Sequence, residues 1–195
     1  MGWTPDFSHV FSTAVKLVPS RATAILSRAA DGEITEVVPH TSALTKSPFF
    51  PGAASDGSVV AFEVQSKLLP AAVAGANNVY VWDRATGDLR LGSVLNDGSA
   101  PPQGAFAGPY DWGGGTNATT LAKGGATLDY YTQEQDAVSG GGKALYFTAA
   151  GKGKGELYLR LNPTEAQSPL DSQDKCTHPE LACTIEVSAS QKDEG

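Results

Sequence analysis

The alternation of apolar and polar side chains is clearest in NNVYVWDRATGDLRLGSV, from Asn77 to Val94. Apolar residues at every second position place one face of an extended strand against a core. The alternation breaks at Ala-Thr-Gly-Asp and then resumes, and Gly or Asp tolerates the positive φ that tight turns need. The stretch therefore predicts an antiparallel hairpin.

The same order of elements recurs along the chain, which is the mark of a repeat architecture. ASDGSVVAF at 54–62 aligns with SGGGKALYF at 139–147, and NVYVW at 78–82 aligns with ELYLR at 156–160. In the first aligned pair, 54–62 and 139–147, each segment is a turn of small residues that leads into a strand. The matched pairs are Gly57 with Gly142, Val60 with Leu145, Phe62 with Phe147, Val79 with Leu157, Tyr80 with Tyr158 and Val81 with Leu159.

A third and less regular copy is TAILSRAADGEITEVV at 23–38. It places Asp31-Gly32 at a hairpin tip equivalent to Thr86-Gly87. In this alignment Ile25 lies opposite Tyr80, and Ile34 lies opposite Leu89.

Short strands, turn signals at close intervals and recurring units predict an all-β protein built of β-propeller blades, each a four-stranded antiparallel sheet. A lone sheet of this kind exposes both faces, so neighbouring sheets must cover it. A sandwich explains short strands but not the recurrence. We expect a single propeller segment over 1–195, with blades at about 7–40, 49–97 and 130–190 and a long inter-blade loop at 98–129.

ASDGSVVAF followed by NNVYVWDRATGDLRLGSV resembles the TolB-like, WD-type β-propeller repeat of bacterial proteins. The resemblance implies a Ser-Pro-Asp-Gly-Ser turn, a strand ending in Ala-Phe and a Gly-tipped hairpin in each blade. Ala54-Ser55 stands where the family often has Ser-Pro, and SGGGK lacks the Asp. Such repeats specify architecture and not activity.

Propellers typically close with about four to eight blades, whereas this chain holds about three. We therefore expect an incomplete ring that further sequence completes, with the pairing of two chains as the alternative. Alternating apolar residues are expected to form the core between blades. They are Phe62, Val79, Val81, Phe147, Leu157 and Leu159.

Charge excludes some classes of partner. The formal net charge is -7, and the 14 Lys and Arg residues are dispersed, so no basic stripe favours nucleic acid or an anionic membrane. No apolar run approaches the roughly 18 residues of a spanning helix, and the first 30 or so lack the order of a signal peptide.

Cys176 and Cys183 lie seven positions apart in KCTHPELACT. This spacing favours an intramolecular disulfide that closes a loop before the last strand, with free structural thiols as the alternative. Two cysteines without a set of His partners make a poor metal site, and we expect no metal. A disulfide favours an extracellular, cell-surface or periplasmic location.

The best candidate for ligand binding is Tyr110-Asp111-Trp112, next to three glycines in the predicted loop. Two aromatic rings beside a carboxylate form a surface that stacks on sugars or holds a peptide. The alternative is that the rings anchor the loop on a blade.

Catalytic patterns are weak, and we predict no catalytic residue and no cofactor. Acids that could serve a glycosidase cannot be shown to converge, and the Gly-Lys-Gly-Lys-Gly run at 151–155 leads into a strand and not into the helix of a phosphate site. No Gly-x-Ser-x-Gly motif occurs, and His9, His40 and His178 are placed in loop-like surroundings. The candidate acids are Asp56, Asp83, Asp111, Asp129, Glu134 and Asp136.

We therefore expect a non-enzymatic binding or assembly scaffold of an exported bacterial protein, with a protein or carbohydrate ligand or with self-association. The alternatives are a carbohydrate-active hydrolase or lyase, and the gating propeller of a larger peptidase.

Overall fold

A computed structural model describes residues 2–4, 8–16, 22–44, 46–108, 136–150 and 155–188. They form three four-stranded antiparallel sheets, in each of which neighbours in the sequence are neighbours in the sheet. The first sheet holds β1 (Gly2–Trp3), β2 (His9–Lys16), β3 (Ala22–Ala29) and β4 (Ile34–Thr41). The second holds β5 (Phe49–Ala53), β6 (Val59–Val64), β7 (Asn78–Asp83) and β8 (Leu89–Leu91). The third holds β9 (Ala105–Ala107), β10 (Ala144–Ala149), β11 (Glu156–Leu161) and β12 (Cys183–Glu186).

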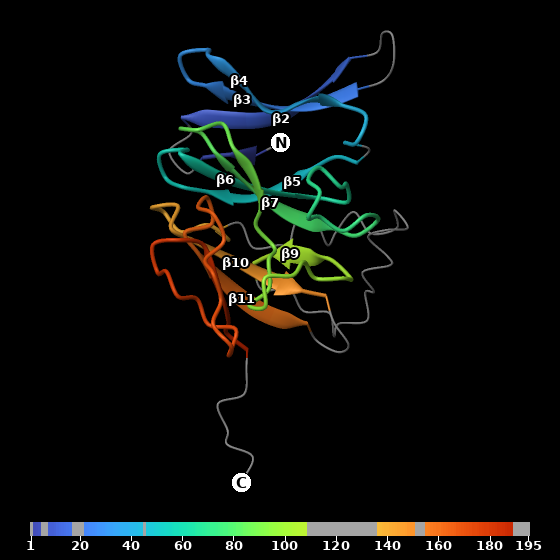
Figure 1. Cartoon of the computed structure of the whole chain (residues 1–195). Coiled ribbons are helices and arrows are strands. Elements are labelled where there is room, and N and C mark those ends of the chain that lie inside the picture. The colour runs from blue at the N-terminus through green and yellow to red at the C-terminus, as the bar shows by residue number, and fades with distance from the viewer. Residues whose placement is uncertain are drawn as a thin grey trace.

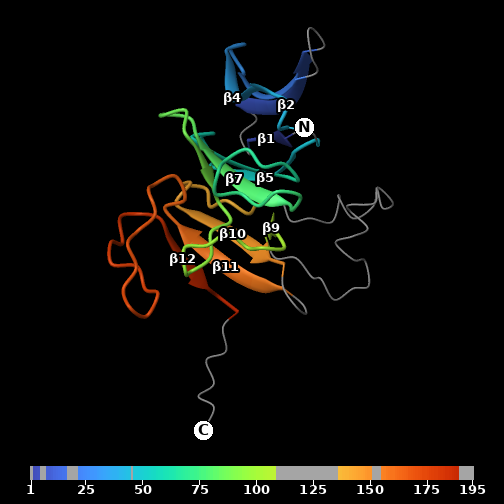
Figure 2. The same cartoon turned by 45° about the vertical axis from the view of Figure 1, so that its right-hand side comes forward.

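The three sheets stack face to face with the second in the middle, as Figure 1 and Figure 2 both show. The prediction of an all-β protein is confirmed. Among the described residues no strand pairs the first sheet with the third, and the stack does not close into a ring. No helix with the length and apolar character to cross a membrane is found in the described part of the chain.

The middle sheet is buried on both faces because its strands alternate between two cores. Val60 and Phe62 of β6 pack with Tyr80 and Trp82 of β7 against Phe11, Ile25 and Val38 of the first sheet. The intervening residues Val59, Ala61, Val79 and Val81 pack against Ala105, Leu145 and Phe147 of the third sheet. Every residue of β6 is consequently buried. One strand thus contributes side chains to two seams, which are the packed interfaces of the middle sheet with the first and with the third sheet. Each seam removes apolar surface from water.

The aligned positions of the second and third sheets are equivalent in space. Phe62 pairs with Tyr80 across β6 and β7, and their rings stack with centroids 5.4 Å apart. Phe147 pairs with Tyr158 across β10 and β11, with centroids 5.2 Å apart. Each aromatic pair faces the preceding sheet of the stack. The repeat read from the sequence therefore corresponds to a repeated packing unit.

The turn glycines of the repeat are equivalent as well. Gly57 and Gly142 have φ of +70° and +69°, and each lies against the preceding sheet. A Cβ at Gly57 would lie 2.8 Å from His9 Nδ1, and one at Gly142 would lie 2.6 Å from Val59 Cγ2. Glycine is needed here both for the backbone angle and for the close approach of two sheets.

The alignment of Ile25 with Tyr80 is wrong by one position. Ala29 closes its hairpin with Glu33, whereas Asp83 closes the equivalent hairpin with Asp88, so the first turn is one residue shorter. Counting back from these ends makes Ile25 equivalent to Val79. Both face the following sheet, whereas Tyr80 faces the preceding one. A slip of one residue reverses the face in a strand of period two.

Of the six predicted core residues, Phe62, Val79, Val81 and Phe147 are confirmed as buried. Leu157 and Leu159 are instead only half-buried, on the outer face of the third sheet, because Tyr158 and Arg160 take its inner face. Loop 98–129 was predicted without a strand but contains β9, a segment of three residues with little alternation to detect.

We predict that Gly142→Ala destabilises the protein more than Gly87→Ala. Gly87 has nearly the same φ of +74°, but a Cβ there meets nothing within 4 Å. Both changes carry the left-handed backbone cost of about 1–2 kcal/mol, and only Gly142→Ala adds about 1–3 kcal/mol of overpacking against Val59. Denaturant unfolding measures both free energies. Equal losses would contradict the close contact between the second and third sheets.

Candidate functional site

The edge strand of the third sheet is interrupted by a long insertion. Ala107 pairs with Phe147 of β10, and Val138 pairs with Leu145 of the same strand. β9 and the segment around Val138 therefore lie end to end along one edge of β10. Gly108 N–H donates to Tyr146 O over 2.8 Å, and Tyr146 N–H donates to Ala137 O over 2.8 Å. The chain therefore leaves this strand after Gly108 and rejoins it at Ala137.

The predicted ligand residues Tyr110, Asp111 and Trp112 belong to this insertion and lie outside the described residues. The structure places only its two ends. Because both ends are held by hydrogen bonds to one residue of β10, the insertion starts and finishes on a rigid sheet. Binding residues are often carried on a long loop that such a scaffold positions.

Glu63 of β6 fastens the first end of the insertion to the middle sheet. Its Oε2 accepts a hydrogen bond of 2.9 Å from Ala107 N–H, and the Asn77 side chain also hydrogen-bonds to it. Asn77 Nδ2 donates to Ala105 O over 3.0 Å. The Glu63 side chain is thus one of several polar links between the second and third sheets.

Burial raises the pKa of Glu63 from its ordinary value of 4.5 to about 8, because the charged form loses water, while the two hydrogen bonds act in the opposite direction. Glu63 is therefore neutral near pH 7. Among the described residues no other acid contributes to this shift, so they place no carboxylate pair of a glycosidase at Glu63.

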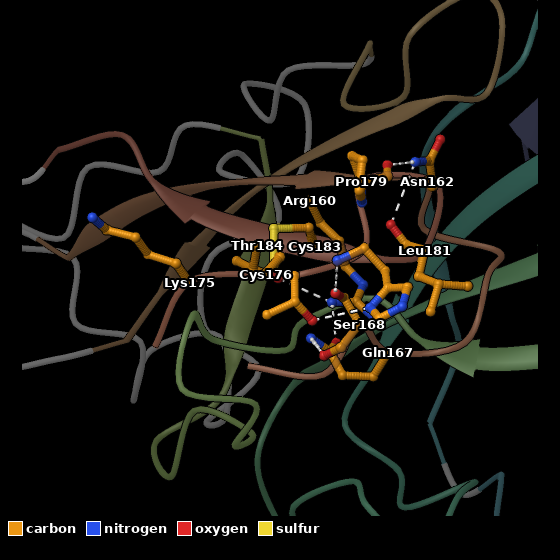
Figure 3. The surroundings of a disulfide bond; sticks show 12 residues. Arg160, Asn162, Gln167, Ser168, Lys175, Cys176, Pro179, Leu181, Cys183 and Thr184 are labelled. Atoms are coloured by element: carbon orange, nitrogen blue, oxygen red, sulfur yellow. Dashed lines mark hydrogen bonds between the residues drawn. A yellow bond between two sulfur atoms is a disulfide. The ribbon is translucent and has the colours of Figure 1, made fainter. Parts of the chain in front are cut away.

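The predicted disulfide is confirmed. Cys176 and Cys183 are bonded with their Cα atoms 5.9 Å apart, and Cys183 is the first residue of β12. The bond closes the last part of the connection from β11, as Figure 3 shows. In the chain-entropy estimate a loop of this size contributes about 2.5 kcal/mol.

Arg160 of β11 lies beside this disulfide connection and faces the middle sheet. It is only 3% exposed, and its Nη1 donates to Gln167 Oε1 over 2.9 Å and to Thr184 Oγ1 over 3.0 Å. Thr184 in turn donates to Val94 O over 2.7 Å, in the segment after β8. Figure 3 shows Arg160 between Gln167 and Thr184. The repeat places Trp82 at the equivalent position of the second sheet.

A Ser–His contact exists at the start of the first sheet but lacks the arrangement of a nucleophile. Ser8 Oγ lies 2.8 Å from His9 Nδ1, and the ring is buried against Gly57. His9 Nε2 is buried without a hydrogen-bond partner among the described residues, which therefore supply no acid to orient the ring. The prediction that His9 and His40 lie in loops is wrong, since they lie in β2 and β4.

Asp56 and Asp83 have the turn roles expected of them. Asp56 Oδ1 accepts from Ser58 N–H over 3.0 Å, and Asp83 Oδ1 accepts from Ala85 N–H over 2.8 Å. Hydrogen bonds from Ser58 lower the pKa of Asp56. Of the remaining predicted acids, Asp136 is described and exposed, whereas Asp111, Asp129 and Glu134 lie outside the described residues. Within the described ranges no three His, Cys, Asp or Glu residues gather as metal ligands would.

Comparison of the sequence with protein-family models and with curated proteins finds no match.

We predict that the free energy of unfolding falls less steeply with rising pH in the Glu63→Gln variant than in the wild type. Because the pKa of Glu63 is higher in the folded chain than in the unfolded chain, the folded state holds the extra proton between about pH 4.5 and pH 8. The stabilisation is complete below that window and falls by up to about 1.4 kcal/mol per pH unit across it. Gln keeps an oxygen for Ala107 N–H and does not titrate.

Denaturant unfolding at pH 5 to 8.5 checks this, with the exposed Glu165→Gln as the matched control. The wild type and the control should lose stability in parallel, and the Glu63→Gln variant should lose less. Identical slopes in all three proteins would show that Glu63 is charged in the folded chain.

Proposed function

We propose that the chain is a β-propeller segment that serves as a non-enzymatic binding or assembly scaffold of an exported bacterial protein. The stack of three consecutive four-stranded sheets supports this proposal, because neighbouring propeller blades also pack face to face. β1 lies against β5, and Ala137, in the segment that continues the line of β9, donates its N–H to Pro51 O of β5 over 3.2 Å. The first strands of the sheets therefore follow one side of the stack. In the proposed propeller these first strands line the central channel.

The observation that carries the proposal is an apolar outer face on the third sheet. Its cross-strand row consists of Tyr146, Leu159 and Ile185. Tyr146 is 39% exposed and Ile185 46% exposed. Leu159 occupies the position that Val81 has in the second sheet, where the following sheet covers it. A repeat that presents the same apolar row at its end fits a further blade, supplied by more sequence or by a second chain.

Two further observations support an exported binding scaffold. The Cys176–Cys183 disulfide is typical of an oxidising compartment. The insertion after Gly108 carries Tyr110, Asp111 and Trp112. In the proposed propeller this insertion begins at the end of β9, the strand that lines the channel. We propose that these three residues bind a carbohydrate or a peptide there. The TolB-like resemblance of the repeat is consistent with a bacterial origin.

We predict that the apolar outer face of the third sheet binds other apolar surfaces and that Leu159→Asp abolishes this binding. The chain should self-associate above its mass of 20.2 kDa or bind a hydrophobic dye while monomeric. Light scattering and dye fluorescence measure the two properties, with Ala85→Asp at the exposed hairpin tip as the control. A monomer that binds no dye would contradict the proposal.

A glycan panel separates the scaffold from the carbohydrate-active alternative. The purified chain is expected to bind without turnover, and Trp112→Ala is expected to weaken that binding because stacking on an aromatic ring is lost. Product formation would establish an enzyme and would overturn the proposed function.

A further inference from the structure

Two arginines meet at the seam between the second and third sheets. Arg90 of β8 pairs with Val81, whose side chain faces the third sheet. Arg160 of β11 pairs with Leu145, whose side chain faces the second sheet. Gly92, two residues after Arg90, lies directly over Leu145, since a Cβ there would be 2.7 Å from its Cδ2. The two arginines thus lie on facing sheets of this seam, near enough for the charge of Arg90 to act on Arg160.

Among the described residues, the hydrogen-bond partners of Arg160 are neutral. Its Nη1 donates to the Gln167 amide oxygen and to the Thr184 hydroxyl, and its Nε is buried without an acceptor. Over the described ranges, the ion pairs are His40 with Glu36 and Arg90 with Asp88, and neither includes Arg160. Buried charges in proteins are normally paired, and this one is not.

Arg90 shows the same pattern on the more exposed side of the pair. Its Nε is also buried without an acceptor, and its ion pair within the described part of the chain joins Nη2 to Asp88 Oδ2 over 3.4 Å. The Arg90 side chain is 38% exposed, so this side of the pair opens to solvent. Loss of water and the nearby charge of Arg90 together lower the pKa of Arg160 to about 10, which leaves both groups charged at neutral pH.

We infer that Arg90 and Arg160 form a binding site for a small oxyanion, a carboxylate or a phosphate group. The planar guanidinium presents parallel N–H donors that match two oxygens of such a group, and a second guanidinium doubles the attraction. The unused Nε–H groups are the donors that the anion would engage. Gln167 and Thr184 hold the Arg160 fork in place, and Thr184 is itself fixed to Val94 O of the second sheet.

Acidic side chains limit the size of the ligand. Burial and the charges of Glu156, Glu186 and Asp97 all act on Tyr158, the next inward-facing residue of β11, and raise its pKa. Glu156 accepts a hydrogen bond of 2.8 Å from the Tyr158 hydroxyl, and Asp97 accepts from Ser99. These carboxylates repel any extended anion from that end of the seam. The site therefore suits a single carboxylate or phosphate group and not a polyanion.

A structural role for Arg160 is the competing explanation. In that case Arg160 fixes the connection between β11 and β12 through Gln167 and binds nothing else. A buried cation with neutral acceptors then stabilises the chain directly, and added anions have no specific effect. The two explanations differ in whether stability depends on an oxyanion.

The test measures the Tm of the full chain at pH 7 and constant ionic strength, while chloride is replaced by inorganic phosphate in one series and by succinate in another. A saturable rise of about 3 °C at ten times the Kd is expected with at least one of the two anions. A rise with phosphate alone identifies a phosphate site, and one with succinate alone identifies a carboxylate site.

Arg90→Gln is expected to abolish the rise, because it removes the half-exposed charge without opening the core. Arg28→Gln, at an exposed position of β3, should keep the whole rise. Arg160→Met should also abolish it, and Arg90→Gln decides the matter if Arg160→Met does not fold. No saturable rise in the wild type, or an undiminished rise in Arg90→Gln, would overturn the inference.

Discussion

The structure depends on one sheet that is buried on both faces. Large side chains on one face of β6 and β7, Phe62, Tyr80 and Trp82, fill the seam with the first sheet. Small ones on the other face, Ala61, Val79 and Val81, allow the third sheet to approach. A four-stranded sheet alone would leave both of these faces in water. Each sheet is therefore stable only through its neighbours, and the middle one has both.

Polar groups in the seam between the second and third sheets serve a different purpose from the apolar ones. Glu63 accepts from the backbone of β9 at one end of the seam, and Arg160 lies at the Thr184 end. Each occupies an inward-facing position on a strand. Both are titratable groups held in a region from which water is largely excluded, and both cost free energy unless a partner satisfies them. Glu63 meets this cost by staying protonated, and we propose that Arg160 meets it with an anion.

Much of the fold could be predicted from the sequence because strand alternation and turn glycines are local signals. The equivalence of Gly57 with Gly142 and of the stacked pairs follows from letters that recur in order. The face of the sheet on which Ile25 lies could not be predicted, because the hairpin turn after β3 is one residue shorter than the turn after β7. The site residues were harder. In the sequence Arg160 is only a charged residue at the position where the repeat has Trp82. Glu63 is only a carboxylate within an apolar run. Neither pattern predicts that the side chain points inward.

The central claim, that the middle sheet is held from both sides, is tested most directly by hydrogen exchange of the backbone amides. Amides of β6 and β7 should exchange only when the whole chain unfolds, with a free energy equal to that of global unfolding. Amides in the hydrogen-bonded strands of the first and third sheets should exchange no more slowly than these. Exchange of β6 and β7 through local opening, ahead of β2 and β3 or of β10 and β11, would contradict the account.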